Sequence, residues 1–351
     1  MGFQRFFAKL CLKTPAPAAA ATTDMRATIS ALAHHVPPDV VGNDHYARLG
    51  VDDAWIRERT GIRERRFARE GATSDLIVAA ARACLERAGL SPKDIDCVLV
   101  ATMTPDRMTP PTSAIVQGKL GMTGAWGFDL NAACCGFLNS LVTAASIVEA
   151  GTARRVLLCA ADLMTRVADT EDPKTAPLFG DGAAVLLIEG TENPDIGVLD
   201  NVLRTDAAGE TVLVIPAGGS ARPASAETVA RREHCLLMDG RTVFRAAVPG
   251  FVEVVKTLLD RNHLTPDEVD WLVPHQANFR IIEAAADRLH FPMSKVMVNI
   301  DRFGNTSAAT IPMCLAEWHD AGKLHAGHRV VLCSFGAGYM LGAVYVRWGL
   351  G

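Results

Sequence analysis

Apolar residues recur along this chain in two alternating patterns, which predict helices and strands in turn. Stretches with helical spacing, such as residues 74–89 (SDLIVAAARACLERAG), predict amphipathic helices, and this one ends at a glycine, a common helix C-cap. Short continuous apolar runs, such as residues 98–103 (VLVATM) and 271–276 (WLVPHQ), predict buried strands. Because strands that alternate with helices are typical of mostly parallel sheets covered by helices, we expect an α/β fold.

The longest apolar run covers residues 330–346 (VVLCSFGAGYMLGAVYV). It is shorter than the roughly 20 residues that span a bilayer, and it contains three glycines. Two core strands joined by a glycine turn explain it better than a membrane span. Its GAGYMLG segment does not fit a dinucleotide-binding loop, because too little chain follows for a βαβ unit.

The two halves of the chain repeat each other at a constant spacing of 174 residues. The matched pairs are Leu90 and Leu264, Asp96 and Asp270, Asn131 and Asn305, Arg155 and Arg329, and Cys159 and Cys333. Repetition at a fixed offset indicates an internal duplication. We therefore expect two halves, residues 26–195 and 196–351, that pack as one pseudo-symmetric α-β-α-β-α body of five layers. The loops that follow equivalent strands should then meet near the pseudo-dyad.

Composition narrows the class of protein. Hydrophobic residues make up 49% and charged residues 21% of the 351 positions, as in soluble globular proteins. The net charge of −4 argues against a nucleic-acid binder, which usually carries a basic patch. The nine cysteines are scattered without a C-x-x-C or a paired zinc spacing, and most lie in apolar runs. We therefore expect reduced thiols in a cytoplasmic protein.

The first 25 residues differ from the rest. Residues 1–14 (MGFQRFFAKLCLKT) are basic and apolar, and residues 15–23 (PAPAAAATT) have the composition of a flexible linker. Lys9 and Lys13 interrupt the apolar run that a signal peptide needs. We expect residues 1–25 to form a disordered extension, with Met25 as an alternative start. A short amphipathic membrane anchor is the other interpretation.

Residues 129–137 (DLNAACCGF) contain the only adjacent cysteine pair in the chain. The pair stands at a turn that enters an apolar helix, where we expect the helix dipole to lower a thiol pKa and favour the nucleophilic thiolate. The alternatives are two small core residues or two metal ligands. A metal site is disfavoured, because no second Cys or His set has a suitable spacing.

Polar residues follow two further predicted strands or turns. His275 ends the apolar stretch 271–276, with Asn278 and Arg280 close behind it, and Asn305 stands in a turn of small residues, GNTS. A single His in such a place is usually structural. The duplication, however, is expected to bring a Cys, a His and an Asn to one point.

Together these stretches resemble β-ketoacyl-acyl-carrier-protein synthase III. The resemblance runs from about residue 26 to residue 348 and rests on DAWIRERTGIRERR (53–66), DLNAACCGF, FGDGAAV (179–185), WLVPHQANFRII (271–282), GNTSAAT (304–310) and FGAG (335–338). It implies the thiolase fold, a duplicated five-layer α/β body, and a homodimer. Thiolases carry a second catalytic Cys where this chain has FGAG, and chain-elongating synthases carry a second His where it has Asn305.

The resemblance also implies a role for each matched residue. Cys134 is the nucleophile, and His275 and Asn305 complete a catalytic triad, while Cys135 stands where the family usually has a small residue. Backbone N–H groups of Cys134 and Ala337 form the oxyanion hole. The substrate-binding residues are Trp55, Arg59 and Thr60 for the nucleotide end of coenzyme A, and Phe244, Asn278 and Arg280 for the pantetheine tunnel or the carrier-protein face.

The reaction implied is a decarboxylating Claisen condensation in fatty acid biosynthesis. An acyl-CoA acylates Cys134, and malonyl-acyl-carrier protein then loses carbon dioxide and attacks the acyl group, giving a 3-oxoacyl-acyl-carrier protein. No metal or redox cofactor is needed, because decarboxylation drives the reaction. Two alternatives stay open: a synthase III-like enzyme of secondary metabolism (polyketide starter, alkylquinolone or ester formation) and an inactive partner subunit.

Two places depart from the family pattern. Pro173 and Lys174 stand where the family often has an Arg that stacks on the adenine of CoA, and Lys pairs with phosphate but does not stack in this way. Thr109 stands where acetyl-specific members carry a bulky Phe that crosses the dimer and limits the acyl pocket. The smaller Thr side chain predicts medium or long acyl donors.

Overall fold

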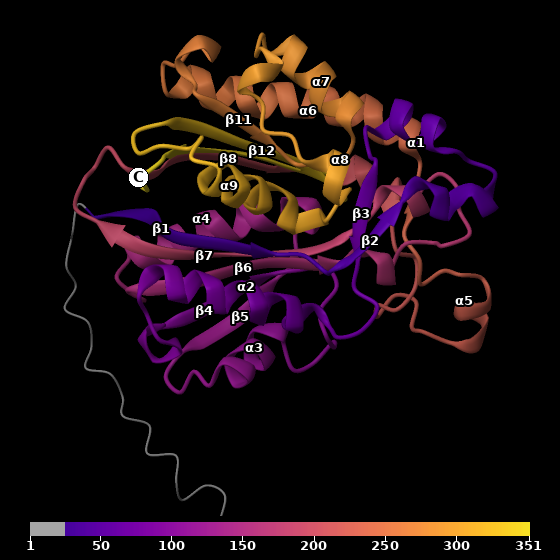
Figure 1. The fold of residues 1–351 in the computed structure, drawn as a ribbon, viewed down its shortest axis with the longest axis horizontal. Helices are drawn as coiled ribbons and strands as arrows, with labels where there is room; N and C mark the ends of the chain where they lie inside the picture. Colours follow the sequence, from indigo (N-terminus) through magenta and orange to yellow (C-terminus); the bar gives the residue numbers. More distant parts are fainter. Residues whose placement is uncertain (1–24) are drawn as a thin grey trace, which may run out of the picture.

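The computed structural model describes residues 25–351, and two stacked sheets form its centre (Figure 1). The first sheet has the strand order β1 (Arg26–His35), β7 (Asp181–Thr191), β6 (Arg155–Leu163), β4 (Cys97–Ala101) and β5 (Trp126–Leu130). The second has the order β11 (Trp271–Pro274), β12 (Arg329–Gly336), β13 (Met340–Arg347) and β8 (Gly197–Thr205). The predicted N-terminal extension, apart from Met25, lies outside the described residues.

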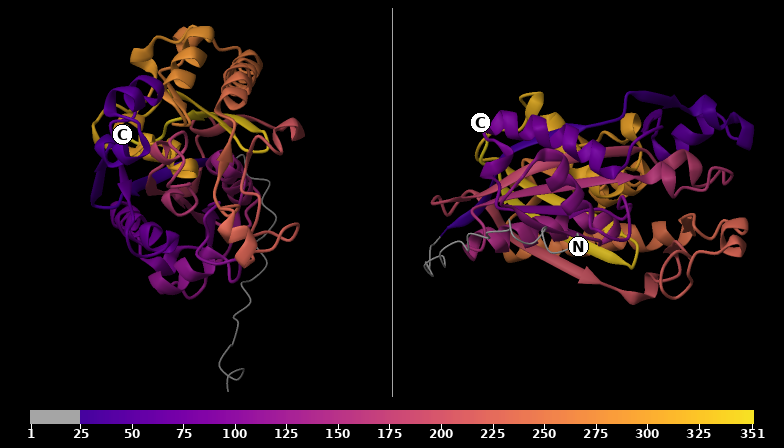
Figure 2. Two further views of the ribbon diagram at one scale, coloured as in Figure 1. Left: turned by 90° about the vertical axis from the view of Figure 1, so that its right-hand side faces the viewer. Right: turned by 90° about the horizontal axis from the view of Figure 1, so that it is seen from below.

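Three layers of helices alternate with the two sheets, which confirms the expected α-β-α-β-α body (Figures 1 and 2). The outer layers are α2 (Thr73–Ala88) and α3 (Thr112–Leu120) on the first sheet, and α6 (Gly240–Arg261) and α7 (Phe279–Arg288) on the second. α4 (Gly136–Glu149) and α9 (Thr310–Asp320) lie between the sheets. The smaller elements are β2 (Asp39–Gly42), α1 (Asp53–Thr60), β3 (Glu64–Phe67), β9 (Leu213–Val214), α5 (Ala226–Ala230), β10 (Leu237–Met238) and α8 (Ile300–Phe303).

Both sheets are mixed, so the expectation of mostly parallel sheets is wrong. β4 pairs in parallel with β5 and β6, and β11 pairs in parallel with β12. β7 and β13, however, run antiparallel to both of their neighbours. Only residues 337–339 join β12 to β13, which is too short for the crossover that a parallel pair needs. The same hairpin confirms the prediction of two core strands within residues 330–346.

The apolar spacing of each helix suits its layer. α2 buries Ile77, Ala80, Ala81 and Cys84, the i, i+3, i+4, i+7 stripe of a helix that covers one sheet. α4 instead packs against strands of both sheets and buries most of its surface. The N-terminus of α4, and the turn that leads into it, is therefore held between the two sheets. Among residues 25–351, every helix is either too short or too polar to span a bilayer.

Candidate active site

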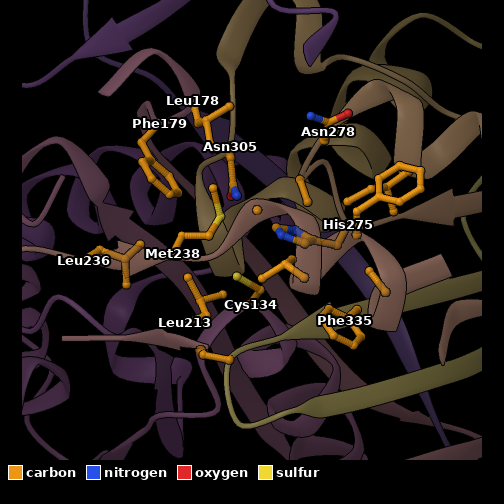
Figure 3. Close-up of a pocket in the computed structure, with 18 of the residues that line it drawn as sticks. Cys134, Leu178, Phe179, Leu213, Leu236, Met238, His275, Asn278, Asn305 and Phe335 are labelled. Atoms are coloured by element: carbon orange, nitrogen blue, oxygen red, sulfur yellow. The ribbon is translucent and has the colours of Figure 1, made fainter. Parts of the chain in front are cut away.

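Cys134, His275 and Asn305 line one pocket, whose empty volume is about 860 Å³ (Figure 3). They come from the turn before α4, from the residue after β11 and from the turn before α9. Equivalent ends of the two halves therefore meet here, as the duplication led us to expect. Most of the remaining wall is apolar and includes Leu178, Phe179, Leu213, Leu236, Met238, Phe244, Phe251 and Phe335.

Cys134 occupies a short 3-10 turn, Ala133–Cys135, immediately before α4. Its carbonyl oxygen accepts a hydrogen bond of 2.8 Å from the Ser334 hydroxyl, and a Cβ at Gly336 would lie 3.1 Å from the Cys134 Cβ. A side chain at position 336 would therefore press on the backbone and Cβ of Cys134, which favours glycine there. These two contacts, both from β12, fix the place at which the thiol enters the pocket.

The Cys134 thiol is not acidic in this setting, which corrects our expectation of a lowered pKa. Burial, with a smaller contribution from the nearby carboxylate of Asp162, raises the pKa of Cys134 to about 12, although a hydrogen bond from Ser307 acts in the opposite direction. The cost of taking a thiolate out of water thus exceeds what the helix N-terminus contributes. The free protein holds a neutral thiol, so attack on a substrate requires a proton acceptor.

His275 is 1% exposed and lines the same pocket as Cys134. Its backbone N–H donates to the carbonyl oxygen of Cys333 at 2.8 Å, which ties it to β12, and its Nδ1 lies 2.7 Å from the Thr310 hydroxyl. Its Nε2 has no hydrogen-bond partner within residues 25–351. Burial lowers the pKa of His275 to about 3, so the imidazole is neutral at physiological pH.

Asn305 is held by its backbone and by its amide oxygen. Its N–H donates to the carbonyl oxygen of Leu178 at 2.8 Å, and its own carbonyl oxygen accepts from the N–H of Gly180 at 3.1 Å. Its Oδ1 accepts from the N–H of Ser307 at 2.8 Å. The Nδ2 group is therefore the part of the side chain left to donate to a ligand.

The other predicted residues fall into two groups. Phe244, Asn278 and Ala337 line the pocket with the triad, whereas Trp55, Arg59, Thr60, Arg280 and Thr109 do not. The Asn278 amide is engaged within the protein, because it accepts from the Arg280 N–H at 2.9 Å and donates to the Arg59 carbonyl oxygen at 3.0 Å. This links α7 to α1 beside the pocket.

The predicted binding residues on and near α1 differ in whether their polar groups are already bonded within the protein. The Arg59 guanidinium lies 4.4 Å above the centre of the Trp55 ring, and the Arg280 side chain pairs with Glu58 at 3.3 Å. Thr60 is buried, and its hydroxyl donates to the carbonyl oxygen of Ile56 and accepts from the N–H of Ile62. Its polar group is thus satisfied inside the protein.

Thr109 and the Pro173–Lys174 pair lie on loops outside the pocket. Thr109 and Lys174 are exposed, and Pro173 is partly buried. The 170s loop is acidic: Asp172 accepts from the Lys174 N–H at 3.0 Å, and Glu171 pairs with Arg48 at 2.9 Å.

Two groups of residues at the site, one lining the pocket and one behind it, were missed from the sequence. Leu213, Leu236 and Met238 lie in or next to two-residue strands, which carry no periodic pattern. Ser307 and Thr310 stand in the GNTSAAT stretch, yet their contacts with the triad depend on the turn geometry. Within residues 25–351, no group of three or more His, Cys, Asp or Glu side chains is placed to hold a metal ion.

Two family models match separate parts of this chain. The model of 3-oxoacyl-[acyl-carrier-protein (ACP)] synthase III matches residues 128–207, which contain Cys134. The model of the C-terminal part of 3-oxoacyl-[acyl-carrier-protein (ACP)] synthase III matches residues 259–348, which contain His275, Asn305 and Ala337.

Individual relatives align over nearly the whole chain. The β-ketoacyl-[acyl-carrier-protein] synthase III of Chlorobaculum tepidum is 47% identical over 328 residues, which are 92% of this chain and 100% of the relative. The crystal structure of 3-oxoacyl-(acyl carrier protein) synthase III from Pseudomonas aeruginosa PAO1 matches with a TM-score of 0.85 at 37% identity, and covers 92% of this chain and 98% of its own. The crystal structure of the priming β-ketosynthase from the R1128 polyketide biosynthetic pathway matches with a TM-score of 0.86 at 33% identity. The match covers 95% of this chain and 99% of that structure's chain.

Proposed function

Because this chain belongs to the 3-oxoacyl-[acyl-carrier-protein] synthase III family of condensing acyltransferases with the thiolase fold, we propose that it joins an acyl group from acyl-CoA to malonyl-acyl-carrier protein. The reaction proceeds through an acyl-Cys134 intermediate and gives a 3-oxoacyl-acyl-carrier protein. The observation that carries the proposal is the meeting of Cys134, His275 and Asn305 in one largely apolar pocket.

In the first half-reaction the Cys134 thiol loses its proton to Nε2 of His275, the nitrogen without a partner. The sulfur attacks the thioester carbonyl, whose developing negative charge is stabilised by the backbone N–H groups of Cys134 and Ala337. Coenzyme A leaves as its thiolate, which solvent then protonates. The acyl group is now bound to the Cys134 sulfur, and Nε2 of His275 carries a proton.

In the second half-reaction malonyl-acyl-carrier protein enters the pocket. The His275 Nε2–H and the Asn305 Nδ2 group donate to the malonyl thioester oxygen, which becomes an enolate oxygen as carbon dioxide leaves. The enolate carbon attacks the acyl carbonyl and expels the Cys134 thiolate. That thiolate takes back the proton from His275, so the enzyme returns to its starting state. Decarboxylation supplies the driving force, and no metal or redox step is needed.

A homodimer formed at β5 would complete the acyl pocket. β5 stands at the end of the strand order of the first sheet, and Trp126 on it is 43% exposed. Met108, in the loop that carries Thr109, is 86% exposed, and this loop lines the same surface hollow as Phe128 of β5. An open strand edge beside exposed apolar side chains favours pairing with a second copy. The small Thr109 would then leave room for medium or long acyl chains.

A second candidate is a priming synthase of secondary metabolism. The match to the R1128 priming β-ketosynthase over 95% of this chain supports it, as does the absence of an Arg at positions 173 and 174. Both candidates use the same acyl-Cys134 chemistry, so they differ only in acyl donor and carrier. Each cysteine of residues 25–351 is a free thiol, which favours a reducing cytoplasm for either.

The test is a series of acyl-CoA donors of two to sixteen carbons with malonyl-acyl-carrier protein as acceptor. We expect an adduct on Cys134 by mass spectrometry and condensation rates that are highest for medium or long chains. A clear preference for acetyl-CoA would contradict the chain-length proposal alone. Absence of any Cys134 adduct with every donor would favour an inactive partner subunit.

A further inference from the structure

Ser307 connects all three residues of the proposed triad. Its N–H donates to Oδ1 of Asn305 at 2.8 Å, and its hydroxyl donates to Sγ of Cys134 at 3.9 Å. Its carbonyl oxygen accepts from the Thr310 hydroxyl at 3.1 Å, and that hydroxyl lies 2.7 Å from Nδ1 of His275. One residue thus contacts two members of the triad directly and reaches the third through one hydroxyl.

The backbone of Ser307 is held in an uncommon shape to make these contacts. Ser307 is fully buried and has a φ of +52°, in the left-handed region that few residues other than glycine adopt. The next residue anchors the turn, because the Ala308 N–H donates to the carboxylate of Asp162 at 3.1 Å. A serine kept in this conformation beside a nucleophile points to a role for its side chain.

The Ser307 hydroxyl is placed to stabilise a negative charge on the buried Cys134 sulfur. Taking the thiolate out of water is unfavourable, and the nearby Asp162 carboxylate, which the Ser307 side chain also reaches, repels negative charge on the sulfur. The neighbouring imidazole of His275 is neutral and offers no compensating charge. A hydroxyl that donates to the sulfur favours the thiolate over the thiol, and such bonds shorten when the acceptor becomes charged.

The Ser307 carbonyl oxygen and Nδ1 of His275 both lie within hydrogen-bond distance of the Thr310 hydroxyl, at 3.1 Å and 2.7 Å. The hydroxyl has a single hydrogen, which it can donate to the Ser307 carbonyl oxygen. In that arrangement the hydroxyl accepts from Nδ1 of His275, and the imidazole proton is on Nδ1. The lone pair is then on Nε2, which is the atom that must take the proton of Cys134.

We propose that Ser307 is a further catalytic residue, whose hydroxyl stabilises the Cys134 thiolate and whose carbonyl, acting through Thr310 as a positioning residue, presents the Nε2 lone pair of His275 to the thiol. The proton-transfer part rests on the proposed function, since it concerns the attack on an acyl thioester. The thiolate part does not, because it can be measured without a substrate.

The experiment compares Ser307→Ala, Ser307→Gly and Thr306→Val. The two changes at position 307 both remove the hydroxyl. Glycine adopts a positive φ without strain and should keep the turn, whereas alanine is strained at this φ. Thr306 is the matched control: it is the adjacent buried residue, and its hydroxyl contacts Sδ of Met313 at 3.7 Å. Circular dichroism and thermal unfolding verify that each variant is folded.

The first readout is the rate of Cys134 alkylation by iodoacetamide between pH 6 and pH 10, followed by mass spectrometry. Both variants at position 307 should displace the profile towards higher pH by roughly half a unit to one unit, the size expected for one hydrogen bond of ordinary strength. Thr306→Val should follow the native profile. A native profile for Ser307→Gly would overturn the role of the hydroxyl.

The second readout is self-acylation by acyl-CoA in single-turnover experiments. Ser307→Gly should slow it by about tenfold, the size expected for the loss of one ordinary hydrogen bond. Thr310→Val should slow self-acylation while leaving the alkylation profile unchanged, and Thr310→Ser should restore the rate. Failure of the native protein to acylate would contradict the proposed function, but the alkylation profiles would still test the hydroxyl of Ser307.

Discussion

Asn131 and Asn305 stand 174 positions apart and make the same turn in the two halves of the protein. Each accepts, through its side-chain oxygen, a hydrogen bond from the backbone N–H two residues later: Ala133 at 3.1 Å and Ser307 at 2.8 Å. Both of these N–H groups belong to residues with positive φ, +47° and +52°. The duplication thus extends to single hydrogen bonds, and Cys134 occupies the position in one half that Ala308 occupies in the other.

The first prediction separates the two adjacent cysteines. Cys134→Ala should abolish adduct formation with acyl-CoA and leave the fold intact, because the thiol lines the pocket and the backbone bond from Ser334 to the carbonyl of residue 134 is kept. Cys135→Ala should keep most of the activity and lower the melting temperature by a few degrees, since Cys135 is fully buried and its thiol donates to the Met340 carbonyl oxygen at 3.2 Å. Mass spectrometry and thermal unfolding check both. Loss of the adduct in Cys135→Ala alone would assign the nucleophile to Cys135.

The second prediction concerns the donor in the second half-reaction. Asn305→Asp keeps the oxygen that accepts from Ser307 but replaces the Nδ2 donor with a second oxygen. Decarboxylation of malonyl-acyl-carrier protein should fall by about 100-fold or more, as when an oxyanion donor is removed, while self-acylation should change less than about threefold. Release of carbon dioxide and Cys134 adduct formation are measured separately.

Asn131→Asp is the matched control for this substitution. Asn131 makes the same turn bond but is exposed and does not line the pocket. Both half-reactions should therefore continue at close to the native rate. Equal losses of both half-reactions in Asn305→Asp would indicate a general disruption of the turn and contradict a donor role for Nδ2.

The elements that the sequence predicted best are those with a long regular pattern. The α2 stripe and the β12–β13 hairpin follow from periodicity and from glycine positions, and the 174-residue offset led to the convergence of the loops. The antiparallel placement of β7 and the irregular wall formed by Leu213 and Leu236 depend on contacts between distant segments, which a local pattern does not contain.

The electrostatics of the site were harder to predict than its location. The dipole at the N-terminus of α4 suggested an acidic thiol, but the burial of Cys134 depends on both sheets and raises its pKa to about 12. The link from Ser307 through Thr310 to His275 likewise joins a turn to a strand end from another part of the chain. Residue identity therefore pointed to three residues that share one pocket, whereas their protonation states needed the three-dimensional surroundings.

The third prediction tests the size of the acyl pocket. Thr109 is exposed in a single chain and lies outside the pocket of Cys134, so its effect depends on contact with a second copy. Thr109→Phe should reduce condensation with long acyl-CoA donors by at least about tenfold relative to acetyl-CoA, because overfilling an apolar site by one large ring is costly. Rates across donors from two to sixteen carbons measure this.

The oligomeric state of the protein is the control for the third prediction. Sedimentation should show the same dimer for the native protein and for Thr109→Phe, so that a change in preference reports on the pocket. A monomeric native protein, or an unchanged chain-length profile in a dimeric variant, would contradict the idea that position 109 limits the acyl chain across the interface.

The fourth prediction is a pH dependence of stability that originates at His275. Its pKa in the folded protein is about 3, below the usual value of 6.5, because burial disfavours the charged ring. The unfolded chain therefore binds a proton more readily, so the stability contributed by the neutral imidazole is complete above pH 6.5 and is lost as the pH falls from 6.5 towards 3. At pH 5 the loss should be about 2 kcal/mol, since each pH unit corresponds to about 1.4 kcal/mol.

Urea unfolding of the native protein and of His275→Gln at pH 8 and pH 5 measures this contribution. Burial also lowers the pKa of His34, His35 and His45, so both proteins should lose stability at pH 5. The difference between them isolates His275: the native protein should lose about 2 kcal/mol more than the variant. An equal loss in both proteins would mean that the His275 ring is protonated, or reached by water, in the folded state. Such a ring would keep a pKa near 6.5 and would still be mostly neutral at pH 8, so this outcome would overturn the effect of burial on the pKa of His275.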